Sequence, residues 1–478
     1  MINPLYQELT DAFPFEPTHE QVVAMNRLAG FVCGSANREL FLLKGYAGTG
    51  KTLVISTLVR VMARHRMRVV LMAPTGRAAK VFSKTSGFPA YTIHKKIYRQ
   101  KSLLDAGSFQ LDHNNHENTL FLVDEASMIS NEGLSGSMFG SGRLLDDLIS
   151  YVYSGPGCRL LMLGDQAQLP PVGEHESPGL SASLLKGYSL EVSEFCLEHV
   201  MRQEHESGIL HNATLLRTFA MDAMNASGFS FKLDGFSDVV RISGSDLIET
   251  LNGCYSRDGI DETMVLCRSN KRAIVYNNGI RSTILDREDE LCRGDMVMIV
   301  KNNYYWTDNL QAQEGADSYA NLPSFIANGD IAVIRRVRRQ RELYGFRFVD
   351  AVLSFPDYDD LEMDVALLLD TLHSESPSLT RDESDRLFNG VMEDYADIPS
   401  KKEKMKKLRE NPHFNALQIK YAYAVTCHKA QGGQWKNIFI DQGYVTPQMQ
   451  DEDYYRWLYT ALTRATQTVY LVNWPEER

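Results

Sequence analysis

Residues Gly45–Thr52 read G-Y-A-G-T-G-K-T and match the phosphate-binding loop pattern G-x-x-x-x-G-K-[ST] at every fixed position. Glycines let such a loop turn tightly, so that successive backbone N–H groups point at phosphate oxygens. The Lys51 ammonium can reach the β- and γ-phosphates of a nucleotide, and the Thr52 hydroxyl can ligate Mg²⁺. The sequence therefore predicts a bound nucleoside triphosphate with Mg²⁺. The expected nucleotide-binding residues of the loop are Gly45, Ala47, Gly48, Thr49, Gly50, Lys51 and Thr52.

Two carboxylates and a glutamine follow other apolar runs. Asp124 and Glu125 come directly after L-F-L-V, and Gln168 lies in L-G-D-Q-A-Q-L-P-P-V after a further run. Ligands of open α/β sheets bind at the carboxyl ends of strands. We expect Asp124 to hold Mg²⁺, directly or through water, and Glu125 to polarise the attacking water. Gln168 is expected to hydrogen-bond the γ-phosphate and that water, which predicts hydrolysis as well as binding.

Other polar residues are candidates to complete the nucleotide site. Gln21, in P-T-H-E-Q, can make paired amide hydrogen bonds to an adenine edge, although taken alone the position fits a surface helix residue better. Arg202, in V-M-R-Q, and Arg464, in L-Y-T-A-L-T-R-A, can reach the γ-phosphate. Guanidinium groups stabilise the charge that develops on a transferring phosphoryl group. The alternative for either arginine alone is a surface ion pair.

Three further segments suit a nucleic-acid strand. Thr92–Tyr98 (T-I-H-K-K-I-Y) interleaves cations and rings, a composition that can hold phosphates and stack bases. Ala73–Lys80 (A-P-T-G-R-A-A-K) opens a helix at its Thr-Gly pair, and a helix N-terminus favours anions. Val425–Trp435 (V-T-C-H-K-A-Q-G-G-Q-W) places polar groups and two glycines after an apolar approach.

The elements that must position these residues form two α/β patterns. In the first ~195 residues, short apolar strands alternate with helical stretches, which indicates a parallel sheet with crossover helices. The expected strands here are Leu40–Lys44, Arg68–Ala73, Thr119–Val123 and Arg159–Leu163. A second pattern begins near Cys196. Its expected strands are Thr263–Cys267, Ile419–Val425, Asn437–Ile440 and Thr468–Val472.

The second pattern is interrupted from about Lys301 to Ile419. The runs C-R-G-D-M-V-M-I-V and F-I-A-N-G-D-I-A-V-I-R-R-V are β-like and carry Gly-Asp and Asn-Gly turns. We therefore expect a small β-barrel inserted in the second α/β domain, with a partly helical, charged extension that reaches about Glu410.

Composition limits the class of protein. The chain has 478 residues, no apolar run near the ~18 residues of a membrane span, and no secretory signal at its start. Its seven cysteines are scattered without a C-x-x-C pair, which argues against a disulfide framework or a zinc site. We expect a cytoplasmic protein that does not bind membranes. The net charge of −11 does not itself favour nucleic acid, but a binding groove needs only local positive charge.

The segments together resemble superfamily 1B DNA helicases of the RecD-like group. The family's motifs appear here in the family's order, from Gln21 to about Arg464, as G-Y-A-G-T-G-K-T, A-P-T-G-R-A-A-K, T-I-H-K, D-E-A-S-M, G-D-Q-A-Q-L-P-P-V, V-M-R-Q, V-T-C-H-K-A-Q-G and L-Y-T-A-L-T-R-A. The resemblance implies an ATP-dependent helicase that moves 5′→3′ on single-stranded DNA and unwinds tailed duplexes. We also expect a monomer, although the sequence leaves the oligomeric state open.

The resemblance also implies a fold and a domain division. It implies an α/β protein with two RecA-like P-loop domains that bind ATP between them, a small hairpin insert in the first and an SH3-like barrel insert in the second. The expected first domain is 1–195, with the strand-separating pin at 99–118 and Phe109 as its most apolar ring. The second domain is expected at 196–300 and 420–478, and the SH3-like insert with its charged helical extension at 301–419.

Roles for the motif residues follow from the resemblance as well. Gln168, Arg202 and Arg464 would complete the ATP site with Lys51, Asp124 and Glu125. The residues expected along the DNA are Thr75, Lys80, His94, Thr426, His428 and Lys429.

Other functions remain open at this point. Within motors, the alternative is a translocase that displaces proteins from DNA and unwinds weakly. From another class, a phosphate-loop kinase or signalling NTPase is disfavoured by the two-domain length and by the Arg464 motif. A noncatalytic nucleic-acid-binding module is disfavoured by the intact Asp124–Glu125 pair.

Overall fold

The computed structural model describes residues 4–34, 38–100, 109–133, 140–200, 207–221, 229–314 and 325–475. The chain divides into two compact units. The first unit comprises Met1–Arg99, Gln110–Ser243 and Ala430–Arg478, and the second comprises Gln100–Phe109 and Gly244–Lys429. Among the described residues, no helix is both long enough and apolar enough to cross a membrane.

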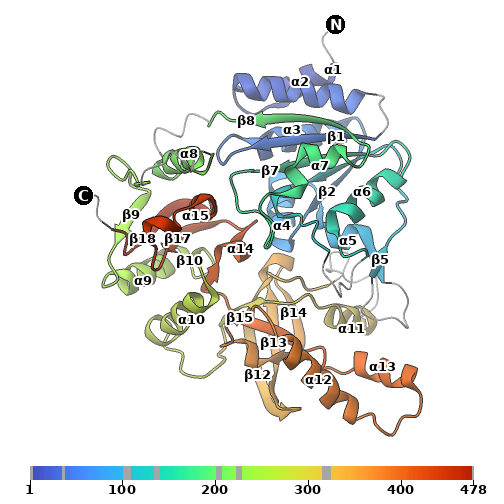
Figure 1. Cartoon of the computed structure of the whole chain (residues 1–478), viewed down its shortest axis with the longest axis vertical. Coiled ribbons are helices and arrows are strands. Elements are labelled where there is room, and N and C mark those ends of the chain that lie inside the picture. The colour runs from blue at the N-terminus through green and yellow to red at the C-terminus, as the bar shows by residue number, and fades with distance from the viewer. Residues whose placement is uncertain are drawn as a thin grey trace. The chain divides into compact units, whose positions relative to one another are not determined.

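A six-stranded sheet with strand order β3-β2-β6-β7-β1-β8 organises the first unit (Figure 1). Every neighbouring pair in it is parallel, as the alternation of strands and helices predicts. Its strands are β1 (Glu39–Gly45), β2 (Arg68–Ala73), β3 (Ala90–Thr92), β6 (Thr119–Val123), β7 (Arg159–Gly164) and β8 (Glu191–Leu197). The four strands expected in this part of the chain are confirmed, and β2 and β6 have the expected bounds.

The register of this sheet aligns the loops that carry the candidate residues. Lys44 of β1 pairs with Gly164 of β7, and Val123 of β6 pairs with both Met162 of β7 and Met72 of β2. The carboxyl ends of β1, β2, β6 and β7 therefore meet at one edge of the sheet. The apolar runs end at this edge, where the sequence becomes polar and rich in glycine.

Helices cover this sheet, and their ends follow the capping residues in the sequence. Thr18 and Gln21 form a capping box at the start of α2, and Thr75 caps α4, which ends at the left-handed Gly87. The helices of the first unit are α1 (Pro4–Ala12), α2 (His19–Cys33), α3 (Lys51–Arg64), α4 (Gly76–Ser86), α5 (Ile93–Ile97), α6 (Leu144–Ser154), α7 (Ala182–Lys186), α8 (Gly208–Met221) and α15 (Glu452–Leu462).

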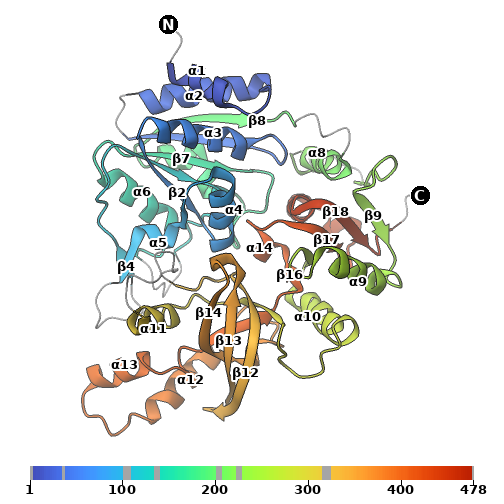
Figure 2. The ribbon, with the colours of Figure 1, turned by 180° about the vertical axis from the view of Figure 1, so that it is seen from behind.

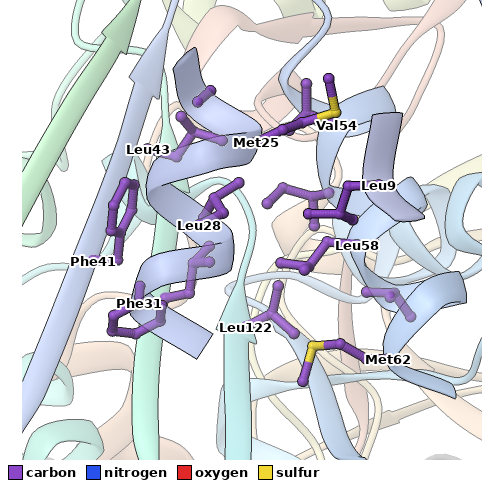
Figure 3. Packing of buried hydrophobic residues seen from close by; sticks show 14 of the residues in the cluster. Leu9, Met25, Leu28, Phe31, Phe41, Leu43, Val54, Leu58, Met62 and Leu122 are labelled. Atoms are coloured by element: carbon purple, nitrogen blue, oxygen red, sulfur yellow. The ribbon is translucent and has the colours of Figure 1, made fainter. Parts of the chain in front are cut away.

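A buried hydrophobic core supports the strand and the helix that flank the phosphate-binding loop (Figure 3). Side chains of α1, α2 and α3 pack together with side chains of β1 and β6. The labelled members of this core are Leu9, Met25, Leu28, Phe31, Phe41, Leu43, Val54, Leu58, Met62 and Leu122. Full burial of each such side chain contributes about 1.5–3 kcal/mol, so β1 and α3 form a rigid base for the loop between them.

Three more parallel strands belong to the first unit. They are β9 (Val239–Ile242), β17 (Trp435–Asp441) and β18 (Ala465–Val472), with β18 between the other two. Helices α8 and α15 pack near them through rings, such as Phe219 against Tyr455 at a centroid distance of 5.6 Å. Because β17 and β18 contain the expected strands at 437–440 and 468–472, both predictions are confirmed.

The hairpin insert predicted in the first α/β pattern is present as a two-stranded sheet. It pairs β4 (Tyr98–Gln100) with β5 (Phe109–Leu111). Residues 101–108, which join the two strands, lie outside the described residues. The assignment of 99–118 as a strand-separating pin therefore stays a prediction.

A closed barrel forms the centre of the second unit (Figure 2). Its strands, in order, are β11 (Met296–Ile299), β12 (Ile331–Leu343), β13 (Phe346–Phe355), β14 (Leu361–Leu368) and β15 (Leu417–Tyr421). The predicted barrel is confirmed, although β11 and the end of β15 lie outside the 301–419 segment. The expected single strand Ile419–Val425 is divided, because β15 ends at Tyr421 and β16 (Ala424–Thr426) pairs with β10 instead.

The charged extension contains two helices, α12 (Arg381–Glu393) and α13 (Lys401–Arg409). Leu387, Val391 and Leu408 of these helices pack against Phe346 and Phe348 of the barrel, so the extension is anchored by an apolar cluster of its own. The remaining elements of the second unit are α9 (Leu247–Asp258), β10 (Thr263–Cys267), α10 (Asn270–Gly279), α11 (Tyr305–Glu314) and α14 (Cys427–Ala430). β10 has the bounds expected for it.

Candidate nucleotide site and strand-binding residues

The phosphate-binding loop joins β1 to α3 and depends on its glycines. Gly48 and Gly50 have φ angles of 77° and 82°, a left-handed conformation that favours glycine. A Cβ atom on Gly48 would come within 2.9 Å of Leu210, and one on Gly45 would come within 3.0 Å of Leu197. A side chain at Gly45 or Gly48 would therefore require Leu197 or Leu210 to move, and at Gly48 and Gly50 it would also strain the backbone.

Lys51 lies at the first turn of α3 with its ammonium folded over the loop. Its Nζ donates to the carbonyl oxygens of Gly45, at 2.5 Å, and Tyr46, at 2.9 Å. The Thr49 hydroxyl also donates to Tyr46 O, at 2.8 Å, which closes the turn. The ammonium therefore lies directly at the loop that is expected to hold the phosphates.

Asp124 and Glu125 follow β6 at the same edge of the sheet. Burial raises the pKa of Asp124 to about 7, and the neighbouring Glu125 carboxylate adds to the rise, while a hydrogen bond from Glu125 N and the Lys51 ammonium oppose it. A nearby cation would stabilise the ionised form of this buried carboxylate. Carboxylate and hydroxyl oxygens are ligands that Mg²⁺ prefers, so Asp124 and the half-buried Thr52 fit a magnesium ion.

Glu125 has a left-handed backbone, with φ 53° and ψ 40°. This conformation costs a non-glycine residue about 1–2 kcal/mol. Its amide donates to Asp124 Oδ1 at 2.8 Å, so the strained turn also holds the Asp124 carboxylate. Backbone strain of this kind is concentrated at functional sites.

Gln168 follows β7 in a loop that its neighbour Asp165 organises. Asp165 Oδ1 accepts from Ala167 N at 2.9 Å, and Asp165 O accepts from Gln168 N at 3.3 Å. The Gln168 side chain is only 5 % exposed, and its Oε1 atom has no hydrogen-bond partner among the described residues. A buried amide oxygen without a partner is costly unless a ligand or water satisfies it.

Arg464 reaches this site from the far end of the sequence. Its guanidinium is 4 % exposed, donates to Thr460 O at 3.2 Å, and has Nη1 4.0 Å from Glu125 Oε1. The surface ion pair considered from sequence is therefore wrong for Arg464, because the side chain is buried beside a candidate catalytic carboxylate. Arg202 lies outside the described residues.

Gln21 is buried and uses both ends of its amide within the protein. Its Oε1 accepts from Thr18 N at 3.0 Å in the capping box, and its Nε2 donates to Thr49 O at 3.1 Å. The alternative of a surface helix residue is therefore wrong. The side chain ties the start of α2 to the phosphate-binding loop, and its contact with adenine stays a prediction.

Sequence patterns did not identify several residues that hold the site together. The Tyr459 hydroxyl donates to Asp165 Oδ2 at 2.6 Å and accepts from Ala47 N at 2.8 Å. The Thr460 hydroxyl accepts from Leu169 N at 2.9 Å, and Gln431 Nε2 donates to Leu169 O at 2.7 Å. Tyr459 and Thr460 lie inside a quoted motif, but no spacing rule shows which loop they touch.

Two expected DNA-contacting residues of the first unit have structural contacts. The Thr75 hydroxyl accepts from Ala78 N at 3.2 Å as the cap of α4. Burial lowers the pKa of His94 to about 4, against an opposing effect of Asp147, so this imidazole is neutral at neutral pH. Lys80 lies half-buried on α4. None of these observations tests a contact with DNA.

In the second unit, a pocket brings together two lysines. Lys420 of β15 and Lys429 of α14 line it, with Thr426 and Asn270 among the polar neighbours. Burial lowers the pKa of each lysine to about 8, and Lys420 lowers that of Lys429 further. None of the described residues that line the pocket is a carboxylate. Lys429 and Thr426 were expected from sequence, Lys420 was not, and the expected His428 is half-buried on α14.

A model of the AAA domain matches residues 18–228, and a model of the UvrD-like helicase C-terminal domain matches residues 421–472. The RecD2 ATP-dependent DNA helicase of Deinococcus radiodurans is 32% identical over 158 residues, which are 32% of this chain and 18% of that protein. The ATP-dependent DNA helicase Dda of Enterobacteria phage T4 is 22% identical over 275 residues, 54% of this chain and 55% of that protein.

The chain thus spans less than two thirds of the length of either relative. Among solved structures, the Pif1 helicase from Bacteroides in complex with ADP-AlF3 and single-stranded DNA has a TM-score of 0.47 and 14% identity. That match covers 96% of this chain and 92% of that one.

The phosphate-binding loop and the carboxylates that follow β6 are typical of a P-loop ATPase, and Arg464, from the late part of the sequence, lies beside Glu125. The two family models cover the early and the late motifs respectively, and both relatives are ATP-dependent DNA helicases. The chain is similar to superfamily 1B helicases of the RecD and Dda type, and these matches support an ATP-hydrolysing DNA helicase.

Proposed function

We propose that this chain converts ATP hydrolysis into 5′→3′ movement along single-stranded DNA and unwinds duplexes that carry a 5′ tail. The observation that carries the proposal is the approach of Arg464 to Glu125, with Nη1 and Oε1 4.0 Å apart. Residues from the early and late parts of the sequence would thereby share one catalytic site, so the state of the nucleotide could control how these segments associate.

Within this site the groups divide the chemistry of hydrolysis. The loop amides and Lys51 would bind the phosphates, and Glu125 would orient and polarise the attacking water. Gln168 would satisfy its unpartnered Oε1 through that water, and Arg464 would stabilise charge on the γ-phosphate as it leaves. Mg²⁺, held by Thr52 and Asp124, would neutralise phosphate charge when it is bound.

The lysine pocket of the second unit is a candidate binding site for a phosphate of the DNA strand. Two partly desolvated ammonium groups, with no carboxylate among the described lining residues, favour an anion. Thr426 and Asn270 add neutral hydrogen-bonding groups, which can contact phosphate or sugar without reading sequence. We assign Lys429 and Thr426 to the strand on this basis and add Lys420 to them.

The test of this function uses two partial duplexes that differ only in the end that carries the single-stranded tail. With ATP and Mg²⁺, the duplex with a 5′ tail should separate and the one with a 3′ tail should not. Lys51→Ala serves as the control without hydrolysis, because it removes the ammonium at the loop. Unwinding of the 3′-tailed substrate alone would reject the direction of movement. Strong DNA-stimulated hydrolysis without strand separation would favour a translocase.

A further inference from the structure

Tyr459 lies at a junction of three elements of the first unit. Its hydroxyl donates to Asp165 in the loop after β7 and accepts from Ala47 N in the phosphate-binding loop. The residue itself belongs to α15, one turn before Arg464. Tyr459 and Asp165 are each 1 % exposed, so water does not compete for the bond between them.

The hydrogen bonds of the hydroxyl are matched to its partners. A phenol hydroxyl can donate one hydrogen bond and can also accept one. Here it donates to the Asp165 carboxylate and accepts from the N–H group of Ala47. Burial raises the pKa of Tyr459 well above 10, and the nearby Asp165 carboxylate raises it further. The hydroxyl therefore stays protonated and keeps its donor role across the working pH range.

Neighbouring contacts extend the junction to both sides of Gln168. Asp165 holds the turn that precedes Gln168, while Thr460 Oγ1 and Gln431 Nε2 hold the backbone of Leu169 directly after it. Thr460 O also accepts from the Arg464 guanidinium at 3.2 Å. A shift of α15 along its axis would therefore displace Gln168 and Arg464 together.

We propose that Tyr459 is a positioning residue for ATP hydrolysis, which sets α15 against the phosphate-binding loop so that Gln168 and Arg464 face the γ-phosphate together. The proposal rests on the ATPase activity within the proposed function. It assigns Tyr459 no contact with the nucleotide. Its effect is therefore expected on turnover more than on nucleotide binding.

The test compares Tyr459→Phe with Tyr454→Phe on the same helix. Phenylalanine keeps the ring and removes the hydroxyl. Tyr454→Phe also removes a hydroxyl that makes a hydrogen bond, since the Tyr454 hydroxyl donates to Gln442 Oε1 at 2.8 Å. Neither Tyr454 nor Gln442 belongs to the candidate nucleotide site. For Tyr459→Phe we expect kcat to fall about tenfold, because the half-buried amide of Ala47 and the buried carboxylate of Asp165 lose a partner, while KM for ATP stays within about threefold.

Two further measurements separate positioning from folding. Nucleotide affinity, measured by fluorescence titration, should stay within about threefold of the unsubstituted chain, and Tm should match that of Tyr454→Phe. A kcat within about twofold of the Tyr454→Phe value would overturn the proposal. It would also be overturned if the loss of turnover equalled the loss of folded protein at the assay temperature.

Measuring ATP hydrolysis in the absence of DNA makes the test of Tyr459 independent of the helicase function. If the unsubstituted chain hydrolyses ATP but DNA does not stimulate it, the proposed function fails. The comparison of the two tyrosines in basal turnover still decides the role of Tyr459.

Discussion

At the scale of single residues, the strained turn at Glu125 has the largest consequence for activity. Its left-handed backbone directs the carboxylate toward Arg464 while its amide holds Asp124. Glycine would relieve about 1–2 kcal/mol of strain at this position, but it would remove the group expected to polarise water. The strain is therefore consistent with selection for catalysis over stability at this residue.

The role of Arg464 can be tested directly. Arg464→Ala should lower ATP turnover by about a hundredfold or more, because the variant lacks the guanidinium expected to stabilise the transferring phosphoryl group. Binding of single-stranded DNA should be nearly unchanged. Arg456→Ala is the matched control, since Arg456 lies on α15, the helix that leads to Arg464, and pairs with Glu452. Turnover of Arg464→Ala near that of Arg456→Ala would exclude a two-sided catalytic site.

At the scale of elements, local sequence patterns predicted most of the scaffold. The strands β2, β6 and β10 have the expected bounds because each is a short, largely apolar run between segments of different character. The run at 419–425 shows the limit of this approach. Apolar character predicts a strand there, but it does not show that Tyr421 ends a barrel strand and Ala424 begins a strand that pairs with β10.

The candidate site also contains both residues that local sequence patterns could predict and residues that they could not. Residues that follow a strand, such as Lys51 and Asp124, are recognisable from their neighbours in sequence. Tyr459 and Asp165 are 294 positions apart, so no local pattern indicates their contact. Sequence analysis also could not have identified Lys420, because its place in the pocket depends on the register of the barrel.

The Ala327–Asp330 turn of the barrel provides a prediction for stability. Burial raises the pKa of Asp330 to about 7, while hydrogen bonds from Tyr358 and Ala327 oppose the rise. The ordinary value is 3.8, so between pH about 4 and 7 the folded state binds more protons than the unfolded state. The contribution of this group to stability is therefore fully present below pH 4 and is lost as the pH rises to 7.

Asp330→Asn should remove this pH dependence, since the amide oxygen can still accept from Ala327 N and does not titrate. We compare the free energy of unfolding of the variant with that of the unsubstituted chain. As the pH rises from 4 to 7, this difference should shift in favour of the variant by at most about 1.4 kcal/mol per pH unit, and above pH 7 it should stay constant. Urea denaturation across this pH range measures the difference. The exposed Asp359→Asn is the control, and parallel pH profiles for Asp330→Asn and the unsubstituted chain would contradict the prediction.

At the scale of the whole molecule, the charge of the chain opposes that of its proposed partner. The net charge is −11, so affinity for DNA must come from local groups of cations. Two such groups are candidates in the second unit: the lysine pocket, and the exposed lysines of α13 at 401, 402, 406 and 407. The described lining of the pocket includes no carboxylate, whereas Lys406 and Lys407 of α13 lie within 4 Å of Glu410.

Substitutions in these two groups should therefore affect DNA binding differently. Lys429→Ala should weaken binding of single-stranded DNA and lower the salt dependence of log K by about 0.7, the value expected when the protein neutralises one phosphate fewer on a single strand. Lys406→Ala, the control, should leave the salt slope unchanged.

Because the pKa of Lys429 is about 8, a bound phosphate should favour the charged ammonium, and affinity should fall as the pH rises above 8. Fluorescence anisotropy over a range of salt and pH measures both effects. Equal salt slopes for Lys429→Ala and the unsubstituted chain would remove the pocket from the path of the strand, and weaker binding confined to Lys406→Ala would assign the phosphate to α13.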